Sequence, residues 1–416
     1  MLIEKRRIRT HAVFYGVFGI ALAMLISACG GPQNVAEERA EQARLAEGDI
    51  VIGAAWPWSS RNDGLYWEGM QMAVDEINAD GGVLGRSLRI RKEDDRESVN
   101  EGRLSAQRFA DDLEVVAVIG HLNSHVSIPA ASIYENAGLL MLNPASTSPE
   151  LTQKGFTRVF RSVNSDVRVS QEMVDFAETR GYKQVLICYV RNEYGMGLAN
   201  AFDRQAGEAG IQVIDRQSYD PLAANRTYSF QRILDAWKDL DFDAIFLAGM
   251  PPQAGYFVAQ ARASGIGVPI FGGDALDSME FVESAGEAAE GVVVASIFHP
   301  DNPRTEVQHF NDAFAERYGT RPDSWAARGY EAVRLLAHAM TQAGSTVPDE
   351  VAVALRRLDG WAGITGTFAF DDKGDVIGKA MVKAVVHDGG FAFLEDGTTL
   401  AREQAGTPVQ PVADRP

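Results

Sequence analysis

Cysteine is nearly absent from this chain of 416 residues, which contains only Cys29 and Cys188. Positive charge is scarce as well, because 39 lysines and arginines stand against 57 aspartates and glutamates, for a formal net charge of -18. Nucleic-acid binding requires a basic face, and recruitment to an anionic membrane surface requires clustered basic residues. The acidic composition therefore argues against a nucleic-acid partner and offers no polybasic membrane patch.

The signatures of common catalytic sites are also missing. The sequence contains no Gly-x-Ser-x-Gly nucleophile elbow, no phosphate-binding loop and no metal-ligand spacing. Serines and histidines gather at 120–127, but no acidic partner completes a triad, and a metal site would need more ligands than His121 and His125. We therefore expect a binding protein without cofactor or metal rather than an enzyme, with both histidines lining a pocket or capping a helix.

The apolar run at the N-terminus, residues 13–25, is shorter than the roughly 20 residues that a membrane-spanning helix needs. Basic residues precede it at 5–9, and Ile-Ser-Ala-Cys follows it, which resembles the lipobox of bacterial lipoproteins. This pattern predicts a signal peptide over residues 1–28 and a lipid anchor on Cys29, on the periplasmic side or the outer face of the membrane. The alternative is an uncleaved anchor in which Cys29 is incidental.

Two terminal segments lack the pattern of a packed element. Residues 29–48 are rich in Ala, Glu, Gln and Arg without an apolar face, which predicts a partly helical tether between lipid and fold. Residues 398–416 are polar with scattered prolines, and we expect a loose tail. Cys188 lies in an apolar strand pattern at 185–189, and with Cys29 acylated it has no disulfide partner.

Strand and helix signals alternate through the rest of the chain. Residues 50–54 and 88–93 predict strands, each followed by an amphipathic helix, at 65–78 and at 100–111 with Ser98 as its cap. The alternation restarts near 167 and runs to about 297, followed by helices at 306–317, 325–342 and 349–358 and a hairpin around 371–375. This order is typical of α/β folds, in which helices cover a doubly wound parallel sheet.

Two of these strands, at 115–119 and 139–142, run directly into polar loops that open helices. Ligands of open parallel sheets bind at such strand ends, where free N–H groups and helix dipoles favour a carboxylate or phosphate. Ser124, Ser146 and Thr147 add hydroxyls that donate or accept hydrogen bonds. Their alternative role is to cap the two helices, but two similar loops on neighbouring strands favour a shared ligand site.

The stretch 120–152, GHLNSHVSIPAASIYENAGLLMLNPASTSPELT, resembles the leucine/isoleucine/valine-binding proteins of bacterial ABC importers. These form the leucine-binding branch of the type I periplasmic binding proteins, and the similarity extends from residue 50 to about 379. The resemblance implies two α/β lobes, each with a doubly wound parallel sheet, joined by a hinge of three crossovers with the ligand between them. By alignment, lobe one covers 49–166 plus 298–360, and lobe two covers 167–297 plus 361–397.

The resemblance also implies roles for individual residues. Ser124 and Thr147 match hydroxyl donors, and Ala145, beside Ser146, matches a residue whose carbonyl accepts from the ligand ammonium. Asp274 stands where the family usually has a Glu that binds this ammonium, although Asp could instead cap a helix. Two further matches are Tyr194, which would close over the ligand, and Asp166, a polar hinge position.

Three departures from the family pattern stand out. Met250 replaces a usual Tyr, so a hydroxyl contact is lost, and the family's disulfide has Glu97 and Asn123 at its positions here. The loop after the first strand carries Trp56 and Trp58 where the family has small residues. These rings could wall the side-chain pocket, stack on a ligand cation, or simply pack against the first helix.

Together these features predict an extracytoplasmic solute-binding lipoprotein. It would capture an amino acid of the branched-chain type, or a related small amphiphile, and deliver it to the permease of an ABC importer. Closing two lobes about a hinge would trap the ligand. The alternative is a lipoprotein of the same fold that senses its ligand and signals to a membrane partner.

Overall fold

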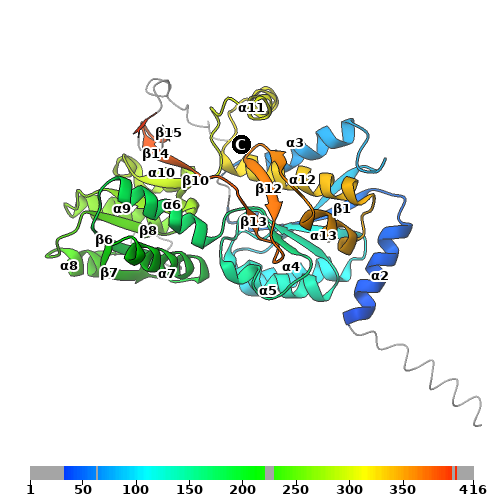
Figure 1. Ribbon diagram of the computed structural model, residues 1–416, viewed down its shortest axis with the longest axis horizontal. Helices are drawn as coiled ribbons and strands as arrows, with labels where there is room; N and C mark the ends of the chain where they lie inside the picture. Colours follow the sequence, from blue (N-terminus) through cyan, green and yellow to red (C-terminus); the bar gives the residue numbers. More distant parts are fainter. Residues whose placement is uncertain (1–31, 62–63, 221–228, 396–398, 401–416) are drawn as a thin grey trace, which may run out of the picture.

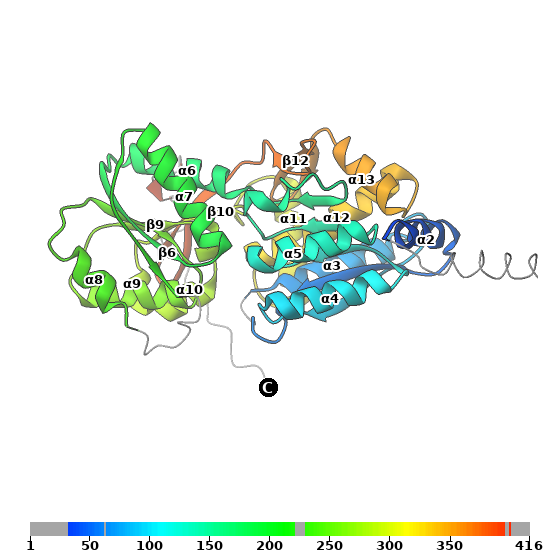
Figure 2. The same cartoon turned by 90° about the horizontal axis from the view of Figure 1, so that it is seen from below.

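The computed structural model describes residues 32–61, 64–220, 229–395 and 399–400. They form two α/β lobes that lie side by side (Figures 1 and 2). The predicted signal peptide, Cys29 and, of the predicted tail 398–416, residues 398 and 401–416 lie outside the described residues. Within that tail, Thr399–Leu400 form a short strand that pairs with Gly390–Glu395, so these two residues are not loose as predicted. Among the residues described, no helix is both long and apolar enough to cross a membrane.

Lobe one is built on a sheet of five parallel strands in the order β2-β1-β3-β4-β5. Its strands are β1 (Ile50–Trp56), β2 (Leu88–Asp94), β3 (Val115–Gly120), β4 (Leu140–Asn143) and β5 (Val159–Arg161). All residues of β1, β3 and β4 are buried, as expected for central strands of a parallel sheet that is covered on both faces. Because the order reverses beside β1, the loops after β1 and β3 border the crevice where ligands of such sheets bind.

Helices cover both faces of this first sheet. One face packs against α3 and α12 and the other against α4 and α5. The elements of this lobe are α2 (Pro32–Leu45), α3 (Tyr66–Ala79), α4 (Val99–Asp111), α5 (Ser124–Asn136), η1 (Pro149–Leu151), α11 (Thr305–Tyr318), α12 (Ser324–Ala343) and α13 (Pro348–Arg356). The predicted cap of α4 is confirmed, since the Ser98 hydroxyl accepts from the backbone N–H of Glu101.

Lobe two repeats the same strand order and then extends it. Strands β7-β6-β8-β9-β10 are parallel, and β14, β15 and β16 continue the sheet in antiparallel pairs. The strands are β6 (Gln184–Val190), β7 (Gln212–Tyr219), β8 (Ala244–Ala248), β9 (Ile270–Gly272), β10 (Val293–Ser296), β14 (Val382–His387), β15 (Gly390–Glu395) and β16 (Thr399–Leu400). The helices are α6 (Asp166–Thr179), α7 (Glu193–Glu208), α8 (Gln231–Trp237), α9 (Gln253–Ala263), η2 (Asp274–Leu276), α10 (Met279–Ala285) and η3 (Gly286–Ala289).

The chain crosses between the lobes three times, as the resemblance implies. The crossings follow β5, β10 and β13. Two of them are tied together at Lys379, whose ammonium donates to the Ser162 carbonyl at 3.0 Å and pairs with Glu331 at 3.4 Å. Burial lowers the pKa of Lys379 to about 8, although its partner Glu331 favours the charged form.

The predicted domain boundary at residue 361 is wrong. Residues 361–377 form a small antiparallel sheet, β11 (Trp361–Gly363), β12 (Gly366–Phe370) and β13 (Val376–Ile377), with the predicted turn between β12 and β13. Phe368 and Phe370 belong to the core of lobe one, where the ring of Phe370 lies 5.3 Å from that of Phe160. Only the strands from β14 onward join lobe two. They extend the sheet of that lobe, and their apolar side chains belong to its core rather than packing beside α12.

The segment predicted as a tether is also different from expectation. Residues 32–45 form helix α2, which docks at the end of lobe one far from lobe two (Figures 1 and 2). The fully buried Arg39 donates to the carbonyl oxygens of Ala110, Asp112, Val115 and Ala137 at 2.5–3.1 Å. An apolar face was therefore not needed, because one arginine satisfies several carbonyls at the edge of the fold.

Candidate ligand site between the lobes

The two serine-rich loops of lobe one are joined by direct contacts at the carboxyl ends of β3 and β4. Ser124, at the first position of α5, accepts a hydrogen bond at 3.0 Å from the Ser146 hydroxyl, and both side chains are buried. Asn143 holds the second loop, because its side-chain oxygen accepts from the N–H groups of Ala145 and Ser146 at 2.9 and 2.6 Å. Neither serine caps its own helix, since no side-chain cap is formed at α5 or at η1.

Asn143 escaped the sequence analysis although it connects both loops. Its amide nitrogen donates to the carbonyl oxygens of Gly120 and His121 at 2.8 and 3.0 Å and to the Ser127 hydroxyl at 3.1 Å. The signal that could have found it is an Asn at the end of an apolar strand and directly before Pro144, where a buried amide needs partners.

A buried carboxylate stands where the chain enters lobe two. The backbone N–H of Asp166 donates to the Thr147 carbonyl at 2.8 Å, which ties the hinge to the second loop. Burial raises the pKa of the Asp166 carboxyl to about 7, while the nearby Thr147 hydroxyl and Arg161 oppose this shift and Asp274 adds to it. The predicted hinge residue therefore also faces the other predicted ligand residues.

Lobe two brings Asp274 and Tyr194 to the same place. Asp274 opens η2 and is 5% exposed, but its side chain caps no helix; Ser278 caps α10 instead. The Tyr194 hydroxyl accepts from the N–H of Ala275 at 3.3 Å, which places the phenol beside Asp274. Burial raises the pKa of the Asp274 carboxyl, and Arg328 opposes this shift.

Arg328 is the residue of this site that the sequence analysis missed. It lies on the buried face of α12 in lobe one and is 2% exposed. Its Nη2 is 3.3 Å from Asp274 Oδ2 in lobe two, its Nη1 donates to the Pro144 carbonyl at 3.3 Å, and its guanidinium lies 4.8 Å from the Trp325 ring centre. An arginine on the apolar face of a predicted helix was the available signal, because a buried charge requires a partner.

The two tryptophans of the first loop have different surroundings. Trp56 is buried and stacks on Tyr66 of α3, with ring centres 4.0 Å apart, and its ring also contacts the edge of Trp325 at 5.7 Å. Trp58 is half-buried and lies against Trp67 of the same helix, with the ammonium of Lys92 4.2 Å from its ring centre. Both rings pack against the first helix, and Trp58 already has a cation of the protein on its face.

Met250 follows the carboxyl end of β8 in lobe two and is half-buried. Its sulfur accepts from the side-chain amide of Asn192 at 3.4 Å, and its backbone N–H donates to the Tyr219 hydroxyl at 3.2 Å. The hydroxyl of Tyr219 on β7 thus lies beside this position, but it already accepts a hydrogen bond from the backbone N–H of Met250.

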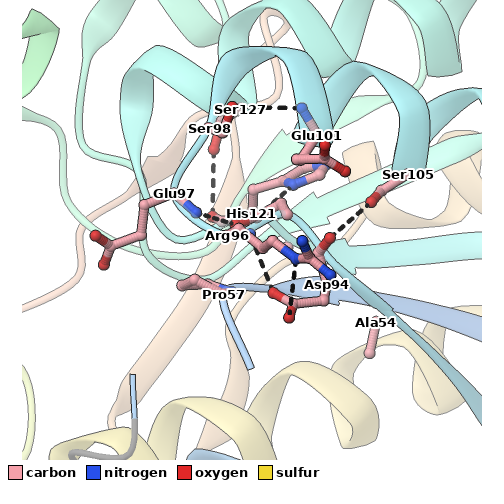
Figure 3. Close-up of polar contacts among 12 residues, drawn as sticks. Ala54, Pro57, Asp94, Arg96, Glu97, Ser98, Glu101, Ser105, His121 and Ser127 are labelled. Carbon is pink, nitrogen blue, oxygen red and sulfur yellow. Dashed lines mark hydrogen bonds and ion pairs between the residues drawn. The ribbon is translucent and has the colours of Figure 1, made fainter. Parts of the chain in front are cut away.

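A hydrogen-bonded network stands near the positions of the family's disulfide. His121 is fully buried, with Nδ1 2.7 Å from Asp95 Oδ2 and Nε2 3.0 Å from the Tyr134 hydroxyl. His125 Nε2 lies 3.1 Å from the carbonyl of Glu97. Figure 3 shows His121 beside the turn that carries Asp94, Arg96, Glu97 and Ser98. These contacts join the first ligand loop to the end of β2 without a covalent bond, and neither histidine contacts Asp274 or Arg328.

Several buried polar atoms of this region have no hydrogen-bond partner among the described residues. They come from both lobes and are Tyr66 Oη, Thr147 Oγ1, Asp166 Oδ1 and Oδ2, Asp274 Oδ1, Trp325 Nε1 and Arg328 Nε. The ion pair between Asp274 and Arg328 and the electrostatic coupling of Tyr66 to Arg328 and of Asp166 to Asp274 place them in one neighbourhood. Since unpaired buried polar groups are rare and costly in native proteins, this cluster has the chemistry of a site for a polar ligand.

Residues 50–390 match the family model described as periplasmic binding protein. The chain belongs to this family. Among curated relatives, the Leu/Ile/Val-binding protein homolog 1 of Brucella abortus is 29% identical over 366 residues, which cover 86% of this chain and 92% of the relative.

Solved structures of the family have the same fold. An ABC transporter substrate-binding protein from Desulfitobacterium hafniense in complex with Leu is 41% identical, with a TM-score of 0.75, over 83% of this chain and all of that one. A leucine binding protein from Thermotoga maritima is 28% identical, with a TM-score of 0.76, over 83% of this chain and 98% of that one. Proteins of this periplasmic family are extracytoplasmic and bind substrates rather than transform them.

Proposed function

We propose that this protein captures an amino acid between its two lobes and delivers it to the permease of an ABC importer. The observation that carries the proposal is the cluster of buried, unpartnered polar atoms contributed by both lobes. An amino acid supplies both a negative and a positive group for such a cluster. The two solved relatives, one in complex with Leu and one described as a leucine binding protein, support the same substrate class.

The charges of the two lobes suit the two ends of a zwitterion. The hydroxyls of Ser124, Ser146 and Thr147, together with the N-terminus of α5, would hold the carboxylate. The free oxygen of Asp274 and the Ala145 carbonyl would accept from the ammonium, with Tyr194 beside them. Because these groups belong to different lobes, the ligand would hold the lobes together.

A contact at the edge of the interface supports a closed state of this kind. Arg61, in the loop after β1, pairs with Glu97 of its own lobe at 3.0 Å and with Glu280 of lobe two. Its Nη1 also donates to the Pro251 carbonyl of lobe two at 3.3 Å. Arg61 thus links the two lobes at the edge of the closed site, and opening the lobes would break its contacts with lobe two.

The proposed anchor also has a geometric consequence. If Cys29 is acylated, only the short segment 30–31 separates the lipid from α2. Since α2 is docked on lobe one, the membrane would lie beside the end of lobe one that is farthest from lobe two (Figure 1). Lobe two would then be free to open and close above the permease.

A thermal-shift screen of the purified protein against the twenty amino acids tests the proposal. A ligand at about 100 times its dissociation constant stabilises the folded state by roughly 2.7 kcal/mol, which raises the unfolding temperature by a few degrees. We expect at least one amino acid to do so, with isothermal titration giving one site per chain. A screen in which no amino acid shifts unfolding would overturn the proposal and favour a sensor for another class of ligand.

A further inference from the structure

We propose that the ligand's side chain carries an acceptor oxygen, which binds to a donor set formed by Tyr66, Trp325 and Arg328. This inference rests on the proposed function and narrows it. It separates this protein from a carrier of aliphatic amino acids, whose side chains offer no hydrogen-bond acceptor. The ligand class is an amino acid with an amide or carboxylate on its side chain.

The three donors come together through the packing of α3 against α12. Trp325 and Arg328 are three residues apart on α12, so their side chains lie on the same face. Tyr66 opens α3, and Gly329 lets the two helices approach closely, because a Cβ at Gly329 would lie 2.3 Å from the Tyr66 carbonyl oxygen. Tyr66 and Arg328 are close enough to interact electrostatically, and the Arg328 guanidinium covers the Trp325 ring.

Each member of the set has a hydrogen available at neutral pH. The indole N–H of Trp325 can only donate, and the guanidinium of Arg328 has no acceptor. Burial raises the pKa of the Tyr66 hydroxyl, so this group stays protonated. Trp325 Nε1, Arg328 Nε and Tyr66 Oη are buried and have no hydrogen-bond partner in the part of the chain that the structure describes, and their residues are 8%, 2% and 4% exposed.

The two terminal nitrogens of Arg328 each have a hydrogen-bond acceptor, whereas Nε has none among the described residues. Nη2 pairs with Asp274 Oδ2 and Nη1 donates to the Pro144 carbonyl, leaving Nε for the ligand. Asp274 in turn keeps its Oδ1 for the ammonium. A single ligand can therefore satisfy both residues without breaking the ion pair between them.

An aliphatic side chain would leave these donors unpaired in the closed state. A site built to hydrogen-bond a polar group rejects an apolar ligand of the same shape because its own buried groups lose their water without compensation. A ligand cation is also disfavoured, since the Arg328 charge lies over Trp325 and Trp56 is already stacked on Tyr66.

The nearby acidic groups decide between an amide and a carboxylate. Asp274 and Asp277 are buried and both interact electrostatically with Arg328, and Asp277 accepts from the Ser296 hydroxyl at 2.7 Å. One guanidinium thus interacts with two carboxyl groups, and Asp166 lies close enough to Asp274 to add its own charge, so a side-chain carboxylate of the ligand would increase the repulsion. An amide and a carboxylate both offer an acceptor oxygen to the donor set, but the neutral amide is repelled less by these carboxyl groups.

Ligands of matched shape test the inference. Leucine, asparagine and aspartate share one branched skeleton, and methionine, glutamine and glutamate form a longer set. Isothermal titration of the wild-type protein should show an oxygen-bearing member binding at least about tenfold more tightly than the apolar member of its set. Whether the amide or the carboxylate binds better identifies the charge of the natural side chain.

Conservative variants assign the preference to this donor set. Trp325→Phe and Tyr66→Phe each remove one donor while keeping a ring, and should weaken binding of the oxygen-bearing ligand several-fold without weakening that of the apolar one. Arg328→Met should abolish the preference. Trp361→Phe, on β11 and outside the set, is the matched control and should leave every affinity within about twofold.

Two outcomes would overturn the inference, and they differ in whether the proposed function, amino-acid capture, also fails. If leucine or methionine binds at least as tightly as its polar counterparts, the donor set does not select the side chain, but amino-acid capture remains. If no member of either set and no other amino acid binds, the proposed function fails with it.

Discussion

The two lobes share a strand order but contribute opposite chemistry to the site. Lobe one presents hydroxyls, an indole and the guanidinium of Arg328, whereas lobe two presents the carboxylates of Asp166 and Asp274 with the phenol of Tyr194. In each lobe the strand ends beside the switch point face the other lobe, as the topology dictates. The fold therefore positions the two sets of residues, and the side chains alone decide that one half attracts anions and the other attracts cations.

This division teaches how closure and recognition are coupled. The positively charged partner of the Asp274 carboxylate, Arg328, comes from the opposite lobe. Separating the lobes exposes both charges to water, so the ion pair adds specificity to the closed state more than net stability. A zwitterion that pairs with both lobes shifts the balance toward closure by its own differential affinity.

The largest expected effect comes from removing the acidic half. Asp274→Ala should reduce amino-acid affinity by at least about a thousandfold, roughly 4 kcal/mol, because the ammonium and Arg328 both lose their buried partner. Titration calorimetry measures the loss. Asp239→Ala, an exposed carboxylate of the same lobe, is the control, and Asp274→Asn keeps the shape if the alanine variant folds poorly. Unchanged affinity in both Asp274 variants would mean that lobe two does not hold the ammonium.

A second prediction affects stability on lobe one alone. Arg39→Ala should lower the free energy of unfolding by about 3 kcal/mol, since four buried carbonyls of α2's docking site lose their donor. Chemical denaturation measures this loss, while ligand affinity should remain unchanged. Arg44→Ala, an exposed arginine on the same helix, should have little effect. A change in affinity would show that α2 communicates with the site.

The acid at the hinge should make unliganded stability depend on pH. Because burial raises the pKa of Asp166 from its usual value of 3.8 to about 7, the folded state binds this proton more tightly than the unfolded chain. Stability is therefore greatest below pH 4 for this group and is lost as the pH rises through 7, by roughly 4 kcal/mol, since each pKa unit corresponds to about 1.4 kcal/mol.

Asp166→Asn removes this dependence and provides the comparison. Thermal unfolding of the wild type and the variant between pH 5 and 8 should diverge, with the variant relatively more stable at pH 8. Parallel curves over this range would mean that Asp166 is solvated or paired in solution.

The smallest effect is expected at the mouth of the site. Arg61→Ala should weaken ligand binding by several-fold, about 1 kcal/mol, through faster dissociation, because the closed state loses its contacts with Glu280 and Pro251. Stopped-flow release of ligand measures the rate. Arg317→Ala, which removes an exposed ion pair with Asp75 within lobe one, should not change it. A slower association with unchanged release would instead assign Arg61 to steering the ligand.

Local patterns were sufficient for most of the fold. The helix cap at Ser98, the turn near 371–375 and the alternation of strands and helices depend on residues close together in the sequence. The position of 361–377 was not predictable in this way, because β11 to β13 lie far in sequence from β5 and α12, against which they pack. The docking of α2 was missed for the same reason, since Arg39 binds carbonyls 71 or more residues away.

The sequence by itself determined the α/β architecture, the two serine-rich loops and the family, since these depend on periodicity and contiguous motifs. Only the tertiary structure decided that Arg328 and Asp274, 54 residues apart, form an ion pair across the lobes, and that Tyr66 and Trp325 add unpaired donors beside it. Hydrogen bonds and charge pairs act over a few ångströms in space. Which distant residues come within that range is set by how α3, α12 and η2 pack, and no local pattern encodes it.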